Sequence, residues 1–127
     1  PIDGFGFQSH IDINFPSEAQ IRNAVDKVVA TGLQVHFSEI DVRMNANNDL
    51  TFPTNSRLQA QRAKCKEVVE IFSDIPKEQQ FAITVWGLID SQTWLIDFWG
   101  QPEWPLLFND DLTPKPAHTG FAEGLKE

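Results

Sequence analysis

The sequence predicts an α/β protein whose strands are parallel. Segments with the alternating pattern of a strand and segments with the spacing of an amphipathic helix follow one another three times along the 127 residues. Strands separated by helices pair in parallel through right-handed crossovers. A closed (β/α)8 barrel typically takes about 250 residues, so this chain forms either a small open sheet or part of a barrel.

The first unit is a strand followed by a helix. The strand is predicted from Ile2 to His10, where Phe residues alternate with small or polar ones. Ser17 and Gln20 have the spacing of a capping box, which satisfies free N–H groups at a helix start. The helix itself is predicted from a stripe of apolar residues, Ile21, Ala24, Val25, Val28 and Val29. Gly32 is expected to end this unit in the left-handed conformation.

The second unit begins directly after this glycine, with a strand from Leu33 to Glu39. Residues 43–56 are rich in Asn and contain a proline, which predicts a long loop. Asn55 or Ser56 is expected to cap the second helix. Its buried stripe is predicted to be Leu58, Arg62, Cys65, Val69 and Phe72.

The third unit follows a break at Pro76. Its strand is predicted from Phe81 to Trp86, and residues 87–114 are expected to be irregular and rich in aromatic side chains. A last short helix is predicted from Pro116 to Leu125, since proline is favoured in the first turn of a helix.

Composition limits the possible partners. Acidic residues outnumber basic ones by 18 to 10, which gives a formal net charge of -8. Without a basic stretch the chain is not expected to bind nucleic acid. No apolar run approaches the roughly 18 residues of a membrane span, and the first residues lack the pattern of a signal peptide. The single cysteine, Cys65, excludes an internal disulfide and a cysteine-based zinc site.

The carboxyl ends of the predicted strands carry residues that could form one site. His10 ends the first strand and Trp86 the third, while Glu39 and Asp41 end the second. Function in parallel α/β proteins lies at this rim. Each residue also has an ordinary structural interpretation, as a hydrogen-bonded histidine, an acidic cap or a core tryptophan. A metal site that adds Asp12 is a weaker alternative, because no second histidine is placed to join it.

Ten Phe and four Trp without any Tyr make the chain rich in flat apolar rings. Sugar rings present apolar C–H faces, and indole rings pack well against such faces. Trp94, Trp99 and Trp104 follow the third strand and could bind a carbohydrate in this way. They could also cover the long loop against the sheet, which we expect of Trp99 and Trp104.

Five motifs in order resemble one known family. They are Asp3-Gly4-Phe5-Gly6-Phe7-Gln8-Ser9-His10, Ser38-Glu39-Ile40-Asp41-Val42, Thr84-Val85-Trp86-Gly87 with Asp90-Ser91 and Trp94, Pro105-Leu106-Leu107-Phe108, and Pro114-Lys115-Pro116-Ala117. This pattern resembles the carboxyl-terminal part of glycoside hydrolase family 10, the retaining endo-1,4-β-xylanases. The resemblance implies that residues 1–127 are part of a (β/α)8 TIM barrel, with three βα units that correspond to its sixth to eighth strands.

The resemblance also implies roles for single residues. Glu39 resembles the catalytic nucleophile, and His10 and Asp41 resemble the pair that hydrogen-bonds around it and keeps it ionised. Gln8, Trp86 and Trp94 resemble residues that bind the sugar beside the cleaved bond. The implied substrate is xylan or a xylo-oligosaccharide, with no cofactor and no metal. The implied location is extracellular, at the cell surface or in the periplasm.

The chain departs from the family pattern at three positions, of which the first two are mild changes. Ser38 and Ile40 flank the nucleophile position where the family usually has Thr and Leu. Cys65 stands in the second helix where the family often has an aromatic residue. The larger departure is that the family's acid/base Glu, which follows an Asn on the fourth strand, has no counterpart here.

No other carboxylate is expected to replace this missing acid. Asp12 and Asp90 are expected in loops without a reason for a raised pKa, and Asp41 lies too near Glu39 on one strand to face it across a sugar. Little or no hydrolysis is therefore expected from the chain alone. A non-catalytic half-barrel that binds carbohydrate or another protein is the alternative.

Two further expectations concern the sheet. Strict alternation would place Glu39 on the opposite face from His36 and Ser38, so a bulge near Ser38 is needed to turn it toward the site. Three strands taken from a barrel would also leave free edges and an uncovered face. We therefore expect a partner, either the missing amino-terminal half or a second copy of the chain.

Overall fold

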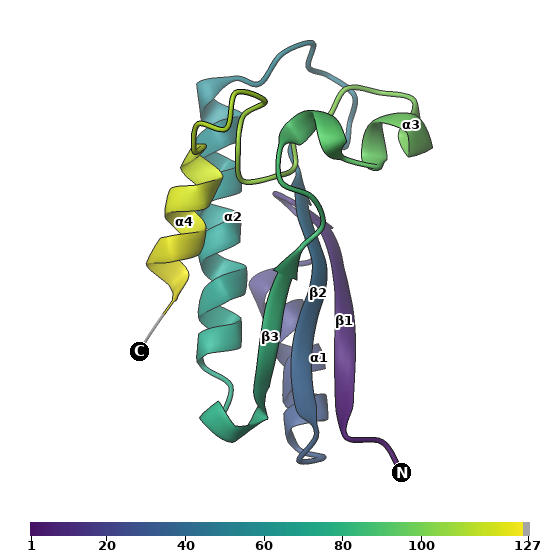
Figure 1. Cartoon of the computed structure of the whole chain (residues 1–127), viewed down its shortest axis with the longest axis vertical. Helices are drawn as coiled ribbons and strands as arrows, with labels where there is room; N and C mark the ends of the chain where they lie inside the picture. Colours follow the sequence, from purple (N-terminus) through teal and green to yellow (C-terminus); the bar gives the residue numbers. More distant parts are fainter. Residues whose placement is uncertain (126–127) are drawn as a thin grey trace.

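The computed structural model describes residues 1–125. Its sheet consists of three parallel strands in chain order, β1 (Gly4–Asp12), β2 (Gln34–Arg43) and β3 (Gln80–Val85) (Figure 1). The predicted parallel order is confirmed. β1 and β2 continue past their expected ends, because Ile11 pairs with Val42 and Asp12 pairs with Arg43 beyond the site residues.

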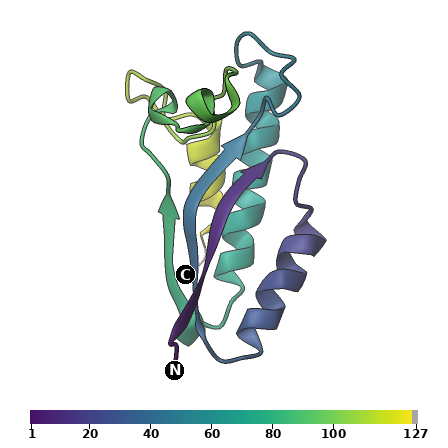
Figure 2. The same cartoon turned by 90° about the vertical axis from the view of Figure 1, so that its right-hand side faces the viewer.

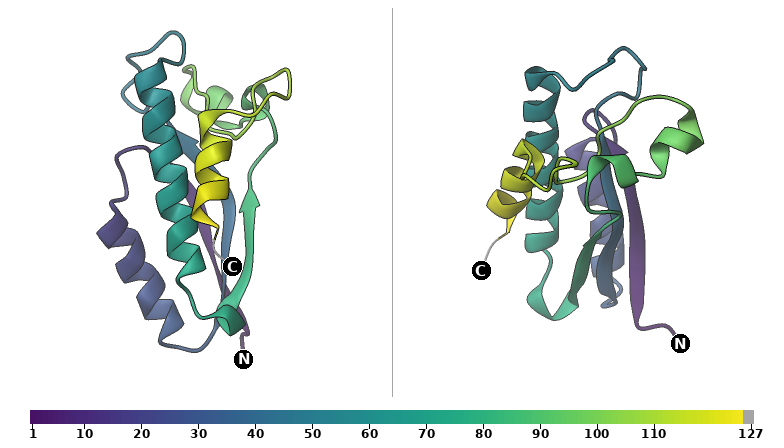
Figure 3. Two further views of the ribbon diagram at one scale, coloured as in Figure 1. Left: turned by 90° about the vertical axis from the view of Figure 1, so that its left-hand side faces the viewer. Right: turned by 45° about the horizontal axis from the view of Figure 1, so that its top comes forward.

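Helices cover one face of this sheet. They are α1 (Glu18–Val29), α2 (Asn55–Ser73) and α4 (Pro116–Gly124), and α4 packs alongside α2 (Figure 3). Figure 2 shows α1 and α2 together on one side of the strands. In the part of the chain that the structure describes, no long helix covers the opposite face. This leaves a two-layer unit rather than a closed barrel.

The start of α1 follows the sequence prediction. The Ser17 side chain accepts from the Gln20 N–H at 3.2 Å, and the Gln20 side chain accepts from the Ser17 N–H at 2.9 Å. Gly32 has a φ of 78°, as expected for a left-handed residue after a helix. The cap of α2 differs from the prediction. Thr54, rather than Asn55 or Ser56, accepts from the Arg57 N–H at 3.3 Å.

The apolar core lies between the sheet and the helices. Phe37 of β2 is buried, and its ring centroid lies 5.9 Å from that of Phe7 on β1 and 5.4 Å from that of Phe72 on α2. Other buried members are Ile11, Val25, Val35, Ile40, Val42, Cys65, Val68, Ile71, Ile75 and Ala117. The stripe predicted for α2 is partly wrong, because Leu58 and Arg62 are only half-buried.

Two polar residues of α2 are buried in their place. The Gln61 Nε2 donates to the Val42 carbonyl at 2.8 Å and to the Trp104 carbonyl at 2.7 Å. The Lys64 ammonium donates to the Pro16 carbonyl. Both side chains thus donate to backbone carbonyls of strand and loop segments, which need partners when they are removed from water. This face of α2 therefore ties the loops at the carboxyl ends of the strands to the helix layer.

A bulge interrupts β2, as the alternation argument predicted. Gln8 pairs with Ser38, but His10, two residues later, pairs with Asp41, three residues later. The pairing with β3 is interrupted over the same residues. Glu39 lies in the bulge with a φ of 54°, in the left-handed region that L-residues seldom occupy.

The segment from residue 87 to residue 114 is more ordered than predicted. It contains the 3-10 helix η2 (Asp90–Gln92) and the short α-helix α3 (Leu95–Trp99), while a further 3-10 helix, η1 (Lys77–Gln79), precedes β3. α3 lies beyond the carboxyl ends of the strands, on the side away from α2 and α4 (Figure 1). Among the described residues, no helix is long and apolar enough to cross a membrane.

Candidate active site

Two carboxylates face one imidazole at the carboxyl rim of the sheet. The His10 Nε2 lies 3.1 Å from the Glu39 Oε1, and the His10 Nδ1 lies 2.9 Å from the Asp41 Oδ2. To donate a hydrogen bond to both carboxylates at once, the imidazole needs a proton on each ring nitrogen, because ionised carboxylates only accept. The three residues that the sequence singled out at two strand ends are thus in direct contact.

The bulge explains how Glu39 and Asp41 both reach His10. Regular pairing onward from Gln8 and Ser38 would place Ile40 beside His10 and turn Glu39 and Asp41 to the opposite face. The extra residue shifts the register so that Asp41 pairs with His10, while Glu39 lies in the bulge itself. The Glu39 side chain keeps 25% of its surface exposed, whereas that of Asp41 is fully buried. Glu39 is therefore the carboxylate that a bound molecule can reach.

Asp41 is held from two sides. Its Oδ2 accepts from the Trp94 Nε1 at 2.9 Å as well as from His10. Burial raises the pKa of Asp41 above its usual value, and the Trp94 and His10 donors oppose this rise. The Asp41 Oδ1 is buried without a hydrogen-bond partner among the described atoms.

Trp94 has a second contact with the site. Its ring lies edge-on to the His10 ring, with centroids 5.0 Å apart, and 36% of the residue is exposed. The resemblance predicted a sugar-binding wall at this position but gave no signal of the hydrogen bond to Asp41. An indole N–H has only donor capacity, so a buried carboxylate is a natural partner for it.

The structure places the other two predicted sugar-binding residues on the same rim. Gln8 is exposed on β1 and pairs with Ser38, the residue before Glu39. Trp86 directly follows β3, is 47% exposed, and its N–H donates to the Ile40 carbonyl at 3.0 Å. Both therefore flank the bulge through their backbones.

The remaining acidic candidates are engaged elsewhere. Asp12 ends β1 rather than lying in a loop, and its Oδ1 accepts from the Asn14 and Phe15 N–H groups at 2.7 and 2.8 Å. The expectation for Asp90 was wrong. Burial raises its pKa, although the Lys115 ammonium 2.9 Å away opposes the rise. Asp90 also accepts from the Leu106 N–H at 2.8 Å, so its role is to anchor the long loop.

Trp99 does not cover the loop as expected. It is 53% exposed on α3, and the Arg43 guanidinium lies 5.1 Å from its ring centroid. Trp104 is half-buried, in partial agreement with the prediction. Within residues 1–125, no group of three or more His, Cys, Asp or Glu side chains is arranged to hold a metal ion.

The arrangement can hold a partly exposed carboxylate in one orientation beside aromatic surface. Such a carboxylate can attack an electrophilic carbon of a bound molecule. Neighbouring polar groups can stabilise the charge that develops on that molecule during the attack. Attack by a positioned carboxylate is the first step of retaining glycoside hydrolysis. The geometry is thus suited to one half of that chemistry.

Comparisons with known proteins identify the family of the chain. Residues 1–124 match the sequence model of glycosyl hydrolase family 10. The chain is 41% identical to endo-1,4-beta-xylanase A of Cellvibrio japonicus (strain Ueda107), over 98% of the chain and 23% of the relative. It is 34% identical to an endo-1,4-beta-xylanase of Geobacillus stearothermophilus, over 92% of the chain and 37% of the relative.

A solved structure shares the fold closely. It is a variant of xylanase 10C from Cellvibrio japonicus in complex with xylopentaose, with a TM-score of 0.93 at 38% identity over 98% of this chain and 27% of that one. The chain thus spans well under half the length of these relatives, as a partial (β/α)8 barrel does. By sequence and by fold, the chain belongs to glycosyl hydrolase family 10.

Proposed function

We propose that the chain is the carboxyl-terminal part of the catalytic domain of a retaining endo-1,4-β-xylanase, in which it forms the sixth to eighth βα units. Glu39 is the nucleophile that forms the glycosyl-enzyme. The observation that carries this proposal is the contact of a partly exposed Glu39 with His10, itself held by the buried Asp41. His10 and Asp41 act as positioning residues for this carboxylate.

The acid/base carboxylate lies outside this chain. Retaining hydrolysis uses two carboxyl groups about 5 to 5.5 Å apart on opposite sides of the scissile bond. Asp41 is buried and is held by His10 and Trp94, so it is not free to protonate a leaving group. The isolated chain is therefore expected to have little or no activity.

The substrate is a β-1,4-linked xylan or xylo-oligosaccharide. A structural relative of the same family binds xylopentaose, and the rim here offers the exposed aromatic surface that a sugar face requires. Trp86 and Trp94 flank the sugar that Glu39 attacks, and Gln8 donates or accepts a hydrogen bond at its hydroxyls. Because xylan is a polymer, the enzyme acts outside the cell, at its surface or in the periplasm.

The sheet of this chain calls for a partner. β1 and β3 are the outer strands of the described sheet and have unpaired edges. On the helix-free face, a hollow of about 520 Å³ lies beside His36 and Phe81, and Phe81 is 66% exposed. A soluble monomer seldom leaves such a surface open. The partner is the amino-terminal half of the barrel.

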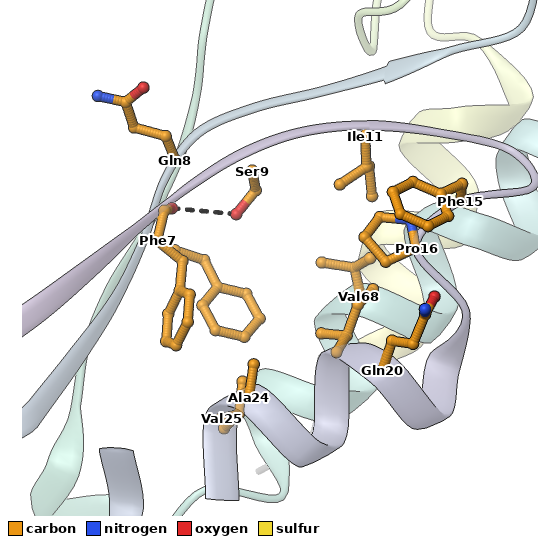
Figure 4. A pocket seen from close by; sticks show the side chains of 12 residues that line it. Phe7, Gln8, Ser9, Ile11, Phe15, Pro16, Gln20, Ala24, Val25 and Val68 are labelled. Carbon is orange, nitrogen blue, oxygen red and sulfur yellow. Dashed lines mark hydrogen bonds between the residues drawn. The ribbon is translucent and has the colours of Figure 1, made fainter. Parts of the chain in front are cut away.

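A second open surface lies beside the free edge of β1. An apolar pocket of about 270 Å³ opens between β1, the turn at Phe15 and Pro16, and α1 (Figure 4). Phe7 and Ser9 face this pocket, whereas the Gln8 side chain points away from it. A neighbouring βα unit would continue the sheet at β1 and fill the pocket with a helix side chain.

The activity is tested by Glu39→Gln in the assembled enzyme. An amide cannot form the glycosyl-enzyme, so xylan hydrolysis should fall by several orders of magnitude, whereas Asp12→Asn should retain activity because Asp12 caps a turn. Normal turnover by the Gln variant would exclude the assignment. Light scattering of the chain with and without the amino-terminal half shows which partner it binds. A stable homodimer that does not bind the amino-terminal half would favour a second copy of the chain as the partner.

A further inference from the structure

The exposed aromatic surface of the rim does not end at Trp94. Its ring centroid lies 4.8 Å from that of Phe98, and the Phe98 centroid lies 5.0 Å from that of Trp99. Phe98 is 61% exposed and Trp99 is 53% exposed. Through Trp94 this row of rings is in contact with His10, 5.0 Å away between centroids. The row therefore begins at the candidate nucleophile site and leads away from it.

Phe98 and Trp99 are held in place although they are exposed. They lie on α3, which ends at Gly100 in the left-handed conformation with a φ of 67°. The Arg43 guanidinium lies over the Trp99 ring, and its Nε donates to the buried Glu103 carboxylate at 3.2 Å. One side of the indole is thus supported by a fixed cation, which leaves another part of the ring accessible.

The position of α3 places these rings beside the path that a long substrate would take from Glu39. The helix projects beyond the carboxyl ends of the strands toward the face that no helix covers (Figure 1; Figure 3, right). A polymer whose reacting sugar lies at Glu39 must continue across this rim in at least one direction. Contiguous exposed apolar side chains mark interaction sites.

We propose that Phe98 and Trp99 form an outlying sugar-binding subsite that contacts a xylosyl unit remote from the one attacked by Glu39. This inference rests on the proposed function and extends it to substrate length. The rings supply apolar contact to a sugar face, and Arg43 keeps the indole oriented. Binding at a remote unit lowers KM for long substrates without touching the reacting atoms.

The test compares substrates of different length in the assembled enzyme. Phe98→Ala and Trp99→Ala should each raise KM for xylohexaose roughly 3- to 10-fold, the size expected for one lost aromatic contact. The kcat values, and kcat/KM for a short aryl β-xylobioside, should stay within about twofold. Trp99→Phe should recover part of the loss. Leu112→Ala, which removes an exposed side chain before α4, should leave both substrates unaffected.

A structural role would give a different result. If Trp99 served only to hold Arg43, Trp99→Ala would lower the melting temperature and impair both substrates equally, and Phe98→Ala would do neither; that outcome overturns the subsite. Xylohexaose binding, measured by tryptophan fluorescence in the Glu39→Gln background, should weaken by the same factor as KM rises. Unchanged binding in that background also overturns it. An enzyme inactive on all xylans would instead contradict the proposed function.

Discussion

The His10 Nε2 lies 3.1 Å from the Glu39 Oε1 although Glu39 has a backbone φ of 54°. Left-handed backbone costs an L-residue roughly 1 to 2 kcal/mol, and such strain persists only where the surroundings hold it. Here the pairing of β2 with strands on both sides fixes the bulge. The contact on which the proposed chemistry depends is thus obtained at a local cost in stability.

This strain predicts an unusual order of stabilities. In urea unfolding, Glu39→Gly should have a free energy of unfolding about 1 kcal/mol higher than Glu39→Ala, because glycine adopts the left-handed conformation freely. At Ser38, whose φ is not positive, the glycine variant should instead be the less stable of the pair. Equal stability of the two Glu39 variants would show that the bulge is not strained.

The hydrogen bond from Trp94 to Asp41 predicts a separable effect of the indole N–H. Trp94→Phe keeps a ring beside His10 but removes the donor at 2.9 Å. Because that donor opposes the effect of burial, the pKa of Asp41 should rise further above its usual value. Carboxyl NMR titration of Asp41 measures this directly, with the Trp99→Phe variant as control. No change in the Trp94→Phe variant would mean that the hydrogen bond is not formed.

The close contact of α4 with α2 predicts that Gly120 cannot be enlarged. A Cβ at Gly120 would collide with the Arg62 carbonyl oxygen, a backbone atom that cannot move aside. Gly120→Ala should therefore destabilise the protein by about 1 to 3 kcal/mol or more, although alanine favours helices. Thr119→Ala on the exposed side of α4 is the matched control. Thermal unfolding compares the two, and equal midpoints would contradict the packing described.

Cys65 predicts a pH dependence with a defined sign. Burial raises the pKa of its thiol from 9.0 to about 12. The folded protein therefore retains the thiol proton where the unfolded chain loses it, so this contribution is complete below pH 9.0 and is lost as the pH rises toward about 12. Cys65→Ala should flatten the fall in stability over that window. Iodoacetamide should label native Cys65 only after unfolding, and rapid labelling at pH 8 would refute the burial.

Local signals explain why much of the fold was predictable. The capping box at Ser17 and the glycine at position 32 act within one turn of chain, so their effect does not depend on distant residues. The bulge was predictable for another reason. His10 and Glu39 could not both face the rim with regular alternation, and only an added residue resolves that conflict.

The remaining features depend on contacts between distant segments. Gln61 and Asp90 are buried because carbonyls, N–H groups and an ammonium from other loops meet them, and no periodicity in their own segments indicates this. Thr54 was missed as a cap because its neighbours Asn55 and Ser56 are residue types preferred over Thr at the N-cap. The exposure of Trp99 depends on where α3 projects, which the aromatic composition alone does not determine.

The most direct test of the central claim is to trap the covalent intermediate. A 2-deoxy-2-fluoro xylobioside with a good leaving group, incubated with the assembled enzyme, should glycosylate one carboxylate with loss of that leaving group and stop turnover, because the fluorine slows hydrolysis of the glycosyl-enzyme. Mass spectrometry of the digested protein should find the added disaccharide on Glu39. A label on any other residue, or inactivation without a label on this chain, would contradict the account.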